Sequence, residues 1–419
     1  MSKYTTKYRA ELPADTIFAG IDLSLDSLVV VVLHAAGQRL DRFRASNHPE
    51  GYAYLRQRLQ RTVERLRAAG LLVGMEPTNY YWKQVGYDLE AHQVPFRLVN
   101  ALTVKRRREG DQLDRSKDDW RDAYAIADLL RTGKFTETHL PHGVYAELQT
   151  GYTAYWRLRQ DRGRQVTLLI NTVRQFFPEV ERQFRSLTGA TAGALLATGL
   201  SPQAIRRQSE AEFMAEVRRY YTRQRLARSP LRQLYALAAH SEGFGEASAA
   251  LAVLAQQQME TIRMLDRQAA QLRASLLQWF GSLPEAPYLL SIQGVSAPSA
   301  LALVAYAGDL QQYRSGAALI KLAGTQPTPN TSGRRTQSAT PFSRQGRSGL
   351  RTALFYMTLS LLRHNEALHY HYQRLTTRPQ HPLPKMQAVG ACMNKVLWYA
   401  WRVVKYRELY DAQRWRELG

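Results

Sequence analysis

The chain has 419 residues, of which 45% are hydrophobic and 22% charged, as in a folded protein of two or three domains. Its net charge of +22 comes mainly from arginine, which binds phosphate in a bidentate manner, so we expect nucleic acid as the partner before an anionic membrane surface. The single cysteine, Cys392, excludes a disulfide framework and a cysteine-rich zinc site and is expected to be a packing residue. Without a spanning apolar run or a signal peptide, we expect a cytoplasmic protein with no membrane partner.

The first third of the chain predicts an α/β domain. In chain order, the pattern predicts strands over 18–22, 28–33 and 38–45, a helix over 49–69 stopped by Gly70, a strand over 71–75, a helix over 81–92, a strand over 94–99 and a helix over 119–131. Between the last strand and the last helix, a dense basic loop is expected at Lys105, Arg106, Arg107 and Arg108. This order of elements is that of a ribonuclease-H-like fold.

Four acids mark the ends of these elements. Asp22 ends the first strand, Glu76 follows the strand expected beside it, and Asp119 and Asp122 share one helix face. Carboxylates that converge in this way suit a pair of Mg²⁺ ions about 4 Å apart. The alternative is that each acid caps a turn or a helix start, and Asp118 competes with Asp119 because it also shares a face with Asp122.

The middle of the chain, from about 145 to 280, lacks strand patterns. An apolar seam at alternating spacings of four and three predicts either packing within a helical bundle or a coiled-coil dimer; it consists of Leu265, Ala269, Leu272, Leu276 and Trp279. Arginines beside Tyr155 and Trp156 suit contact with nucleic-acid backbone and bases, or a solvated helix face. Residues 187–250 contain several loops and are interpreted as an insertion.

The last third contains two candidate phosphate-binding segments. A turn at Gly294 joins two predicted helices, and is either a helix-hairpin-helix that holds phosphate at a helix N-terminus or a plain connector. After a helix over 313–323, residues 331–351 are rich in hydroxyls, arginine and glycine and precede an apolar helix over 350–362. Within this segment Arg334, Arg335 and Arg344 are candidate phosphate clamps, and Ser332 is either a turn residue or a nucleophile.

Several of these motifs together resemble the DEDD transposases of bridge-RNA-guided insertion elements. The segments GID at Asp22, GMEPTNYYW at Glu76 and KDDWRDAYAIADLL at Asp119 and Asp122 carry the resemblance in the first half, where Lys117 matches the lysine before the aspartate pair. The second half matches at Ser332-Gly333, Arg344-Gln345-Gly346 and Leu350-Arg351. The chain departs from the family pattern at Asn79 and Ser296, where the family has glycines, and near Ser338, where a glycine is absent. The resemblance covers 17–133 and 286–405.

The resemblance implies three domains and a composite active site. Residues 1–145 would form a RuvC-like domain with the DEDD metal site, 146–285 a helical, coiled-coil region with an insertion near 187–250, and 286–419 a mainly α transposase domain with the catalytic serine. Two Mg²⁺ ions, with Mn²⁺ as the alternative, would bind Asp22, Glu76, Asp119 and Asp122, while Ser332 from a different protomer would attack DNA and form a 5′-phosphoserine. The implied nucleic-acid contacts are Lys105, Arg106, Arg107, Arg108, Lys117, Gly294, Arg334, Arg335, Arg344 and Arg351.

The implied enzyme is an RNA-guided DNA recombinase, or transposase, of an insertion element. Its partners would be double-stranded donor and target DNA, a structured bridge RNA and further copies of itself, as a dimer that assembles into a tetramer in the prokaryotic cytoplasm, at the nucleoid when active. The main alternative is a RuvC-like metal-dependent nuclease or Holliday-junction resolvase that forms no serine adduct. An actin-like sugar kinase, suggested by GIDLSLDS, and a non-catalytic RNA-binding protein rank below it.

Overall fold

The computed structural model describes residues 12–77, 80–111, 118–135, 140–221, 226–241, 243, 245–328, 331–332, 335–336 and 341–417. These residues form two compact units, 1–140 and 141–419, which are described separately below. The finer division of the second unit near residue 285 remains a prediction.

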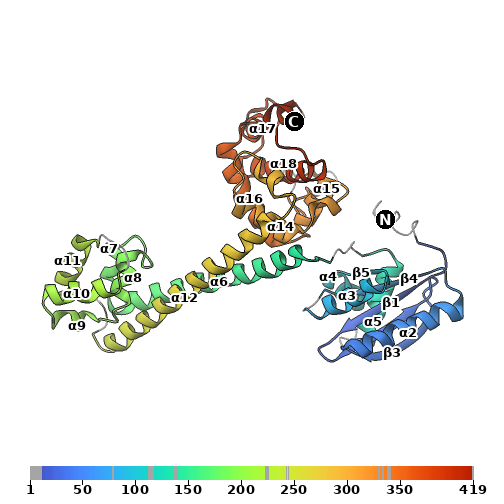
Figure 1. Ribbon diagram of the computed structural model, residues 1–419, viewed down its shortest axis with the longest axis horizontal. Helices are drawn as coiled ribbons and strands as arrows, with labels where there is room; N and C mark the ends of the chain where they lie inside the picture. Colours follow the sequence, from blue (N-terminus) through green and yellow to red (C-terminus); the bar gives the residue numbers. More distant parts are fainter. Residues whose placement is uncertain are drawn as a thin grey trace. The chain divides into compact units, whose positions relative to one another are not determined.

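The first unit is built on a five-stranded mixed sheet with the strand order β3-β2-β1-β4-β5 (Figure 1). Strand β2 is antiparallel to β1 and β3, whereas β4 and β5 run parallel to β1. The strands are β1 (Thr16–Leu23), β2 (Ser27–Leu33), β3 (Arg39–Ser46), β4 (Gly70–Met75) and β5 (Phe96–Leu98). This mixed sheet confirms the expected α/β domain and fits a ribonuclease-H-like fold.

Helices cover both faces of this sheet. Helices α2 (Pro49–Leu66) and α3 (Tyr81–Ala91) pack on the face that carries Ile17, Ala19 and Ile21 of β1. Helices α4 (Ala101–Asp111) and α5 (Asp119–Arg131) pack on the opposite face. Because β1 and β2 are buried on both faces, their sequences are almost continuously apolar, which explains why they were predictable.

Two local predictions in this unit were wrong. Helix α2 ends before Gly70, because Arg67 takes a left-handed conformation (φ 48°), its amide donates to the carbonyl of Glu64, and the amide of Ala68 donates to the carbonyl of Val63. Gly70 instead starts β4. The basic run at 105–108 is part of helix α4 and not a loop. Lysine and arginine are good helix formers, and Val104 anchors this helix in the core at 3% exposure.

The second unit is organised around two long antiparallel helices, α6 (Val144–Phe176) and α12 (Ser248–Gly281), which pack along each other (Figure 1). Arg162 of α6 donates to Asp266 of α12 over 2.6 Å, while Gly151 lies against Leu276. Leu265, Ala269 and Leu276 of the predicted seam are buried. The seam therefore packs against α6 of the same chain.

A small helical group with its own apolar core joins the far ends of α6 and α12 and includes most of the predicted insertion. Its core is formed by residues such as Phe177, Leu195, Phe213 and Leu231, together with Val173 of α6. The elements of this group are α7 (Glu179–Gln183), α8 (Ala190–Leu196), α9 (Pro202–Arg206), α10 (Glu210–Arg219), α11 (Arg228–Leu237) and η1 (Ala238–His240).

The opposite ends of α6 and α12 contribute to a second, larger apolar core, which includes Leu148, Leu276 and Phe280. Cys392 is buried in this core, and burial raises the pKa of its thiol to about 12, as expected for a packing residue. The elements that follow α12 are α13 (Ala286–Leu290), α14 (Ala297–Ala307), η2 (Leu310–Gln312), α15 (Gly316–Ala323), β6 (Thr331–Ser332), β7 (Arg335–Thr336), α16 (Ser348–His364), α17 (Glu366–Thr377), α18 (Lys385–Lys405) and α19 (Ala412–Glu417).

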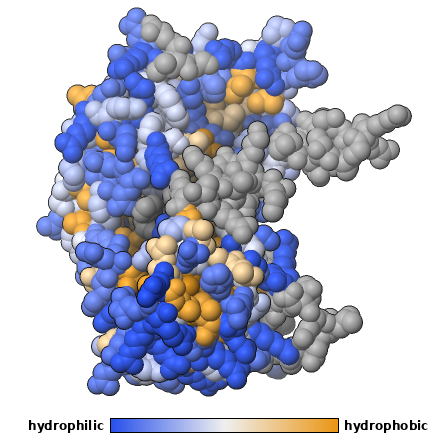
Figure 2. All heavy atoms as spheres, turned by 90° about the vertical axis from the view of Figure 1, so that its right-hand side faces the viewer, coloured by the Kyte–Doolittle hydropathy of each residue, from blue (hydrophilic) through white to orange (hydrophobic). Residues whose placement is uncertain are grey.

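The surface is mainly hydrophilic, as expected for a chain in which 22% of the residues are charged. On the face drawn in Figure 2, hydrophilic residues predominate and apolar residues form small separate patches. Within the described ranges, no helix has both the length and the apolar character needed to span a membrane.

Candidate metal and nucleic-acid site

Asp22 and Glu76 lie at the carboxyl ends of two neighbouring parallel strands. The register pairs Gly20 with Gly74 and Ile21 with Met75, so the next position on each strand places Asp22 opposite Glu76. Gly20 and Gly74 both face α5, and side chains two residues apart point to the same face of a sheet. Both carboxylates therefore belong to the α5 side of the sheet, and both residues are partly buried.

Helix α5 lies unusually close to the strand that carries Asp22. A Cβ added to Gly20 would lie 2.1 Å from the carbonyl oxygen of Ala123 and 2.4 Å from the amide nitrogen of Ala127. Asp122 precedes Ala123 in the first turn of this helix and is only 8% exposed. The absence of a side chain at Gly20 thus lets the buried aspartate of α5 approach the same sheet face as Asp22.

The two remaining aspartates of this segment differ in their partners. Asp118 is the N-cap of α5, and its Oδ1 accepts the amide of Trp120 over 3.1 Å. The carboxylate of Asp119 is half exposed and lies 4.0 Å from a guanidinium nitrogen of Arg44. Because Asp118 is used to cap the helix, Asp119 is the better candidate for the fourth ligand.

The acids share one side of the sheet without forming a closed ligand set. In the part of the chain that the structure describes, no group of three or more Asp, Glu, His or Cys side chains is placed to hold one ion. Magnesium is usually bound by one or two protein carboxylates together with waters and substrate phosphates, so an open arrangement is not unusual for it. The donors are all carboxylate oxygens, which fit a hard divalent cation.

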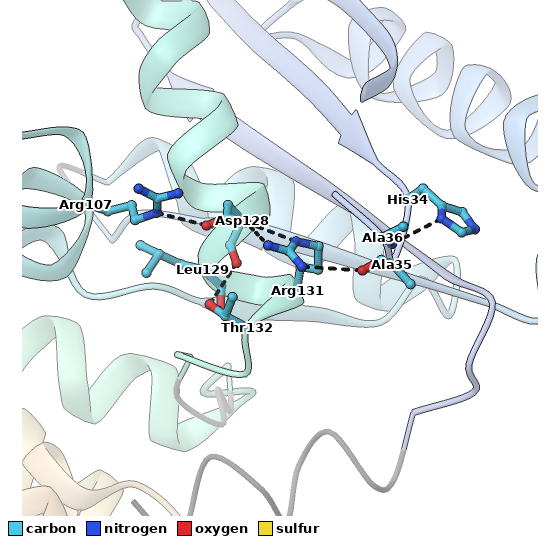
Figure 3. A network of polar contacts seen from close by, with 8 residues as sticks. All are labelled: His34, Ala35, Ala36, Arg107, Asp128, Leu129, Arg131 and Thr132. Carbon is cyan, nitrogen blue, oxygen red and sulfur yellow. Dashed lines mark hydrogen bonds and ion pairs between the residues drawn. The ribbon is translucent and has the colours of Figure 1, made fainter. Parts of the chain in front are cut away.

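The basic residues of α4 do not all face solvent. The Nε of Arg107 donates to Asp128 over 2.9 Å, and Arg131 donates to the other carboxylate oxygen over 3.0 and 2.6 Å (Figure 3). Arg131 also donates to the backbone carbonyl of Ala35 over 3.4 Å. Burial alone would raise the pKa of the Asp128 carboxyl. The hydrogen bonds from Arg107 and Arg131 outweigh this effect and bring the pKa of Asp128 below its ordinary value.

This cluster changes the interpretation of the predicted nucleic-acid contacts. Arg107 ties α4 to α5 through Asp128, a structural role that the sequence did not suggest. Lys105 and Arg106 are exposed on α4. Lys117 and the side chain of Arg108 lie outside the described residues.

Two arginines that the sequence analysis missed lie beside Trp120, and one of them, Arg44, also lies near Asp119. Arg42 and Arg44 of β3 are exposed, and each guanidinium lies 5.4 Å from the centre of the Trp120 ring. They alternate with the buried Phe43 and Ala45. This alternation with a period of two residues could have been read from the sequence, because it indicates that both arginines point to the sheet face opposite Phe43 and Ala45, which is the α5 face.

Gly294 has a structural role in its turn. Its φ is +92°, and an added Cβ would lie 3.1 Å from the Cβ of His364. In the first turn of α14, Pro298 lacks an amide hydrogen, while the amides of Ser299 and Ala300 donate to the carbonyl of Ser296. Few amides of this turn are thus left for a phosphate, whose binding at Gly294 remains a prediction.

Ser332 lies on a paired segment, for which the sequence analysis predicted no strand. Ser332 pairs with Arg335 across β6 and β7, and further bonds join Thr328 to Pro341 and Ser343 to Gln326. The described parts of 324–347 thus form a two-stranded antiparallel arm, with Ser332 at the end away from α15 and α16. The side chains of Ser332 and Arg335, and all of Arg334, lie outside the described residues.

The base of this arm is fixed by glycines and by Arg351. A Cβ on Gly346 would lie 2.4 Å from the backbone nitrogen of Gly324. The Nη1 of Arg351 donates to the carbonyls of Ala323 and Gly346 over 2.8 and 3.2 Å. Arg351 therefore caps α15, while Arg344 is exposed on the arm.

Comparison with known proteins identifies the family. One family model, described as a transposase of the DEDD type of IS110, matches residues 19–178, and a second, the transposase IS116/IS110/IS902 family, matches 286–373. The chain belongs to the IS110 family of transposases. It is therefore an enzyme of DNA transposition, which confirms the resemblance found in the sequence.

Two relatives from Streptomyces align with most of this IS110-family transposase. A protein of Streptomyces coelicolor, whose name assigns it as a mini-circle transposase for IS117, is 25% identical over 422 residues and covers 95% of this chain and 96% of its own length. An uncharacterised 44.8 kDa protein of insertion element IS116 from Streptomyces clavuligerus is 25% identical over 348 residues, covering 82% and 84%. Among solved structures, T. thermophilus RuvC in complex with a Holliday junction substrate covers 29% of this chain and 98% of its own, with 16% identity and a TM-score of 0.21.

Proposed function

We propose that this transposase cuts and exchanges DNA strands with a carboxylate site and a serine nucleophile. The carboxylates are Asp22, Glu76, Asp119 and Asp122, and the nucleophile is Ser332. The main support is the strand register, which ends with Ile21 opposite Met75, so that Asp22 and Glu76 follow on the sheet side covered by α5, the helix that carries the buried Asp122. Ser332 is assigned from the family resemblance of its Ser-Gly pair and from its place on the arm.

The serine step conserves the energy of the phosphodiester. The Oγ of Ser332 loses its proton and bonds to phosphorus, while the bond from phosphorus to the 3′ oxygen breaks and that oxygen takes up a proton. The products are a 5′-phosphoserine and a free 3′-hydroxyl. A 3′-hydroxyl from another strand then reverses the step, so strands are rejoined without ATP.

The carboxylates would bind divalent cations for this reaction. Bound Mg²⁺, or Mn²⁺ in its place, would neutralise phosphate charge and favour the ionised hydroxyl. The chain's own contribution is to place Asp22 and Glu76 at the ends of neighbouring parallel strands and to keep Asp122 buried on α5. Arg344 and Arg335 on the arm are the proposed phosphate clamps.

A structured RNA is proposed to choose the DNA sites. The support is the family resemblance and the net charge of +22, which suits the backbone of an A-form duplex as well as DNA. Recombination between two duplexes requires several nucleophiles, so the active form is proposed to be a dimer that assembles into a tetramer.

The decisive experiment is adduct trapping with paired donor and target DNA, the element's RNA and Mg²⁺. The wild type should give a covalent protein–DNA species that is lost in Ser332→Ala, and Asp22→Asn should abolish it while DNA binding is retained. Ser343→Ala, on the same arm, is the matched control and should form the adduct. Cleavage by Ser332→Ala without any adduct would support the resolvase-like alternative instead.

Metal binding has a test that does not depend on activity. Calorimetric titration with Mn²⁺ should show binding to the wild-type protein and at least tenfold weaker binding to Asp22→Asn and Glu76→Gln. Equal binding by all three proteins would contradict the proposed ligand set.

A further inference from the structure

A hollow of about 290 Å³ lies on the second unit and has no part in the proposed carboxylate and serine chemistry. Its floor is helix α14, with Ser299, Ala302 and Tyr306, and α14 packs against both α6 and α16. The two walls carry Trp156 of α6 and Tyr356 of α16. We call this hollow the aromatic groove.

The inner rings of the aromatic groove are held rigidly. Tyr152 meets Tyr306 edge to face, with 5.3 Å between ring centres. The Tyr306 ring lies on Gly349, where an added Cβ would be 2.3 Å from the ring. Burial raises the pKa of both tyrosines above the ordinary value, in keeping with rings that are packed and not solvated.

The outer rings of the groove are exposed to solvent. Trp156 is 37% exposed and Tyr356 is 64% exposed, although both are large apolar groups. Tyr356 also lines a second hollow of about 290 Å³, together with Phe355, Met386 and Met393. The exposed Tyr356 ring therefore borders two apolar hollows. This position suits a ring that stacks against planar groups such as bases.

The charge beside the aromatic groove favours an anionic occupant. Arg347 precedes α16, is exposed, and donates one guanidinium hydrogen bond to the carbonyl of Tyr306. A guanidinium has five N–H donors in a planar fork, so this contact ties Arg347 to Tyr306, which lines the groove, and leaves other donors for a phosphate. Flat apolar surfaces next to a phosphate-binding cation are the combination that single-stranded nucleic acid requires.

We propose that the aromatic groove binds unpaired bases of a DNA strand, which stack on Trp156 and Tyr356 while Arg347 contacts the adjoining phosphate. This inference rests on the proposed function, because exchange of strands between two duplexes leaves nucleotides unpaired near the crossover. Stacking on aromatic rings tolerates any base, so the groove would hold the strand without reading its sequence.

The test is binding of a four-way DNA junction that carries 2-aminopurine at unpaired positions beside the crossover. The full-length chain with Ser332→Ala is used without divalent metal, so that no cleavage occurs. Stacking should quench the fluorescence of the probe. Tyr356→Ala and Trp156→Ala should each weaken binding about 5- to 100-fold and remove the quenching, whereas Tyr356→Phe should retain both.

The matched control is Tyr370→Ala, which removes a 51% exposed tyrosine of α17 that lines neither hollow. It should bind the junction like the parent. Circular dichroism of every variant checks the fold, and Tyr356→Ala alone suffices if Trp156→Ala fails to fold.

Four results would overturn this inference. The first is unchanged junction binding by the variants, and the second is an equal loss for a fully paired duplex. The third is a change in oligomeric mass without a change in DNA binding, which would make the groove an interface between copies of this chain. A single-stranded RNA of the same sequence is measured in parallel, and loss of RNA binding alone would contradict a DNA occupant. Because the readout is binding by Ser332→Ala, failure of the phosphoserine mechanism would leave this test interpretable.

Discussion

Replacing Gly20 by alanine should separate α5 from the sheet. The new Cβ would lie 2.1 Å from the carbonyl oxygen of Ala123 and 2.4 Å from the nitrogen of Ala127. Both are backbone atoms of a helix, so neither can rotate away as a side chain would. The helix must move outward by about 1 Å to restore an ordinary contact distance.

The cost of this movement can be bounded from the packing. Over-packing a close-packed interior typically costs about 1–3 kcal/mol, and a clash with helical backbone belongs at the upper end. For a unit of this size, about 3 kcal/mol lowers the melting temperature by roughly 10 °C. Because α5 carries Asp119 and Asp122, the same movement should weaken Mn²⁺ binding at least tenfold.

The assay is thermal unfolding followed by circular dichroism, together with calorimetric titration of Mn²⁺. The matched control is Gly163→Ala in α6, where an added Cβ meets nothing within 4 Å. That substitution should stabilise the protein by about 0.5–1 kcal/mol, since alanine favours a helix interior. If Gly20→Ala melts within about 1 °C of the wild type and binds Mn²⁺ equally well, the proposed coupling between α5 and the metal site is refuted.

Three further predictions concern charged groups. Asp128→Ala should destabilise the first unit by about 2 kcal/mol in urea unfolding, because it leaves Arg107 and Arg131 without the carboxylate that they share. Both arginines are partly exposed, which keeps the loss below that of a fully buried ion pair. An unchanged urea midpoint would contradict this prediction. Glu285 is 1% exposed, and burial raises the pKa of its carboxyl above the ordinary 4.5, although the hydrogen bond from Tyr145 acts in the opposite direction. The contribution of Glu285 to stability is therefore complete below pH 4.5 and is lost as the pH rises through the raised pKa. Glu285→Gln should therefore flatten the decline of stability with pH, and identical urea profiles for the two proteins between pH 4.5 and 8 would argue against a protonated Glu285. Arg42→Ala and Arg44→Ala should each reduce the steepness of the plot of log affinity against log salt concentration for duplex DNA by about 1. Arg219→Ala on α10 is the control and should leave this slope unchanged. Equal slopes for all variants would exclude a phosphate contact beside Trp120.

Much of the first unit could be predicted from local patterns. Strands β1 and β2 are continuous apolar runs, and α5 begins and ends where expected because Asp118 caps it and its apolar residues recur at helical spacing. The family could be recognised because its motifs are short and contiguous, and the comparisons confirmed it. Each of these signals lies within a few residues of the feature that it predicts.

Contacts between residues that are distant in the sequence could not be predicted from such local patterns. Nothing near Arg107 indicates that its partner is Asp128, 21 residues away, and so the basic run was interpreted as a loop. The close approach of Ala123 to Gly20 depends on how α5 crosses β1. The aromatic groove requires three helices to bring Trp156, Tyr306 and Tyr356 together.

The sequence by itself therefore determined the five strands of the first unit and the family, because these follow from local periodicity and short motifs, whereas the four acids remain a prediction. Tertiary structure alone decided which charged groups pair with each other and which remain at the surface. It also placed Ser332 on a paired arm that the sequence did not predict, since hydrogen bonds between separated segments depend on the fold as a whole.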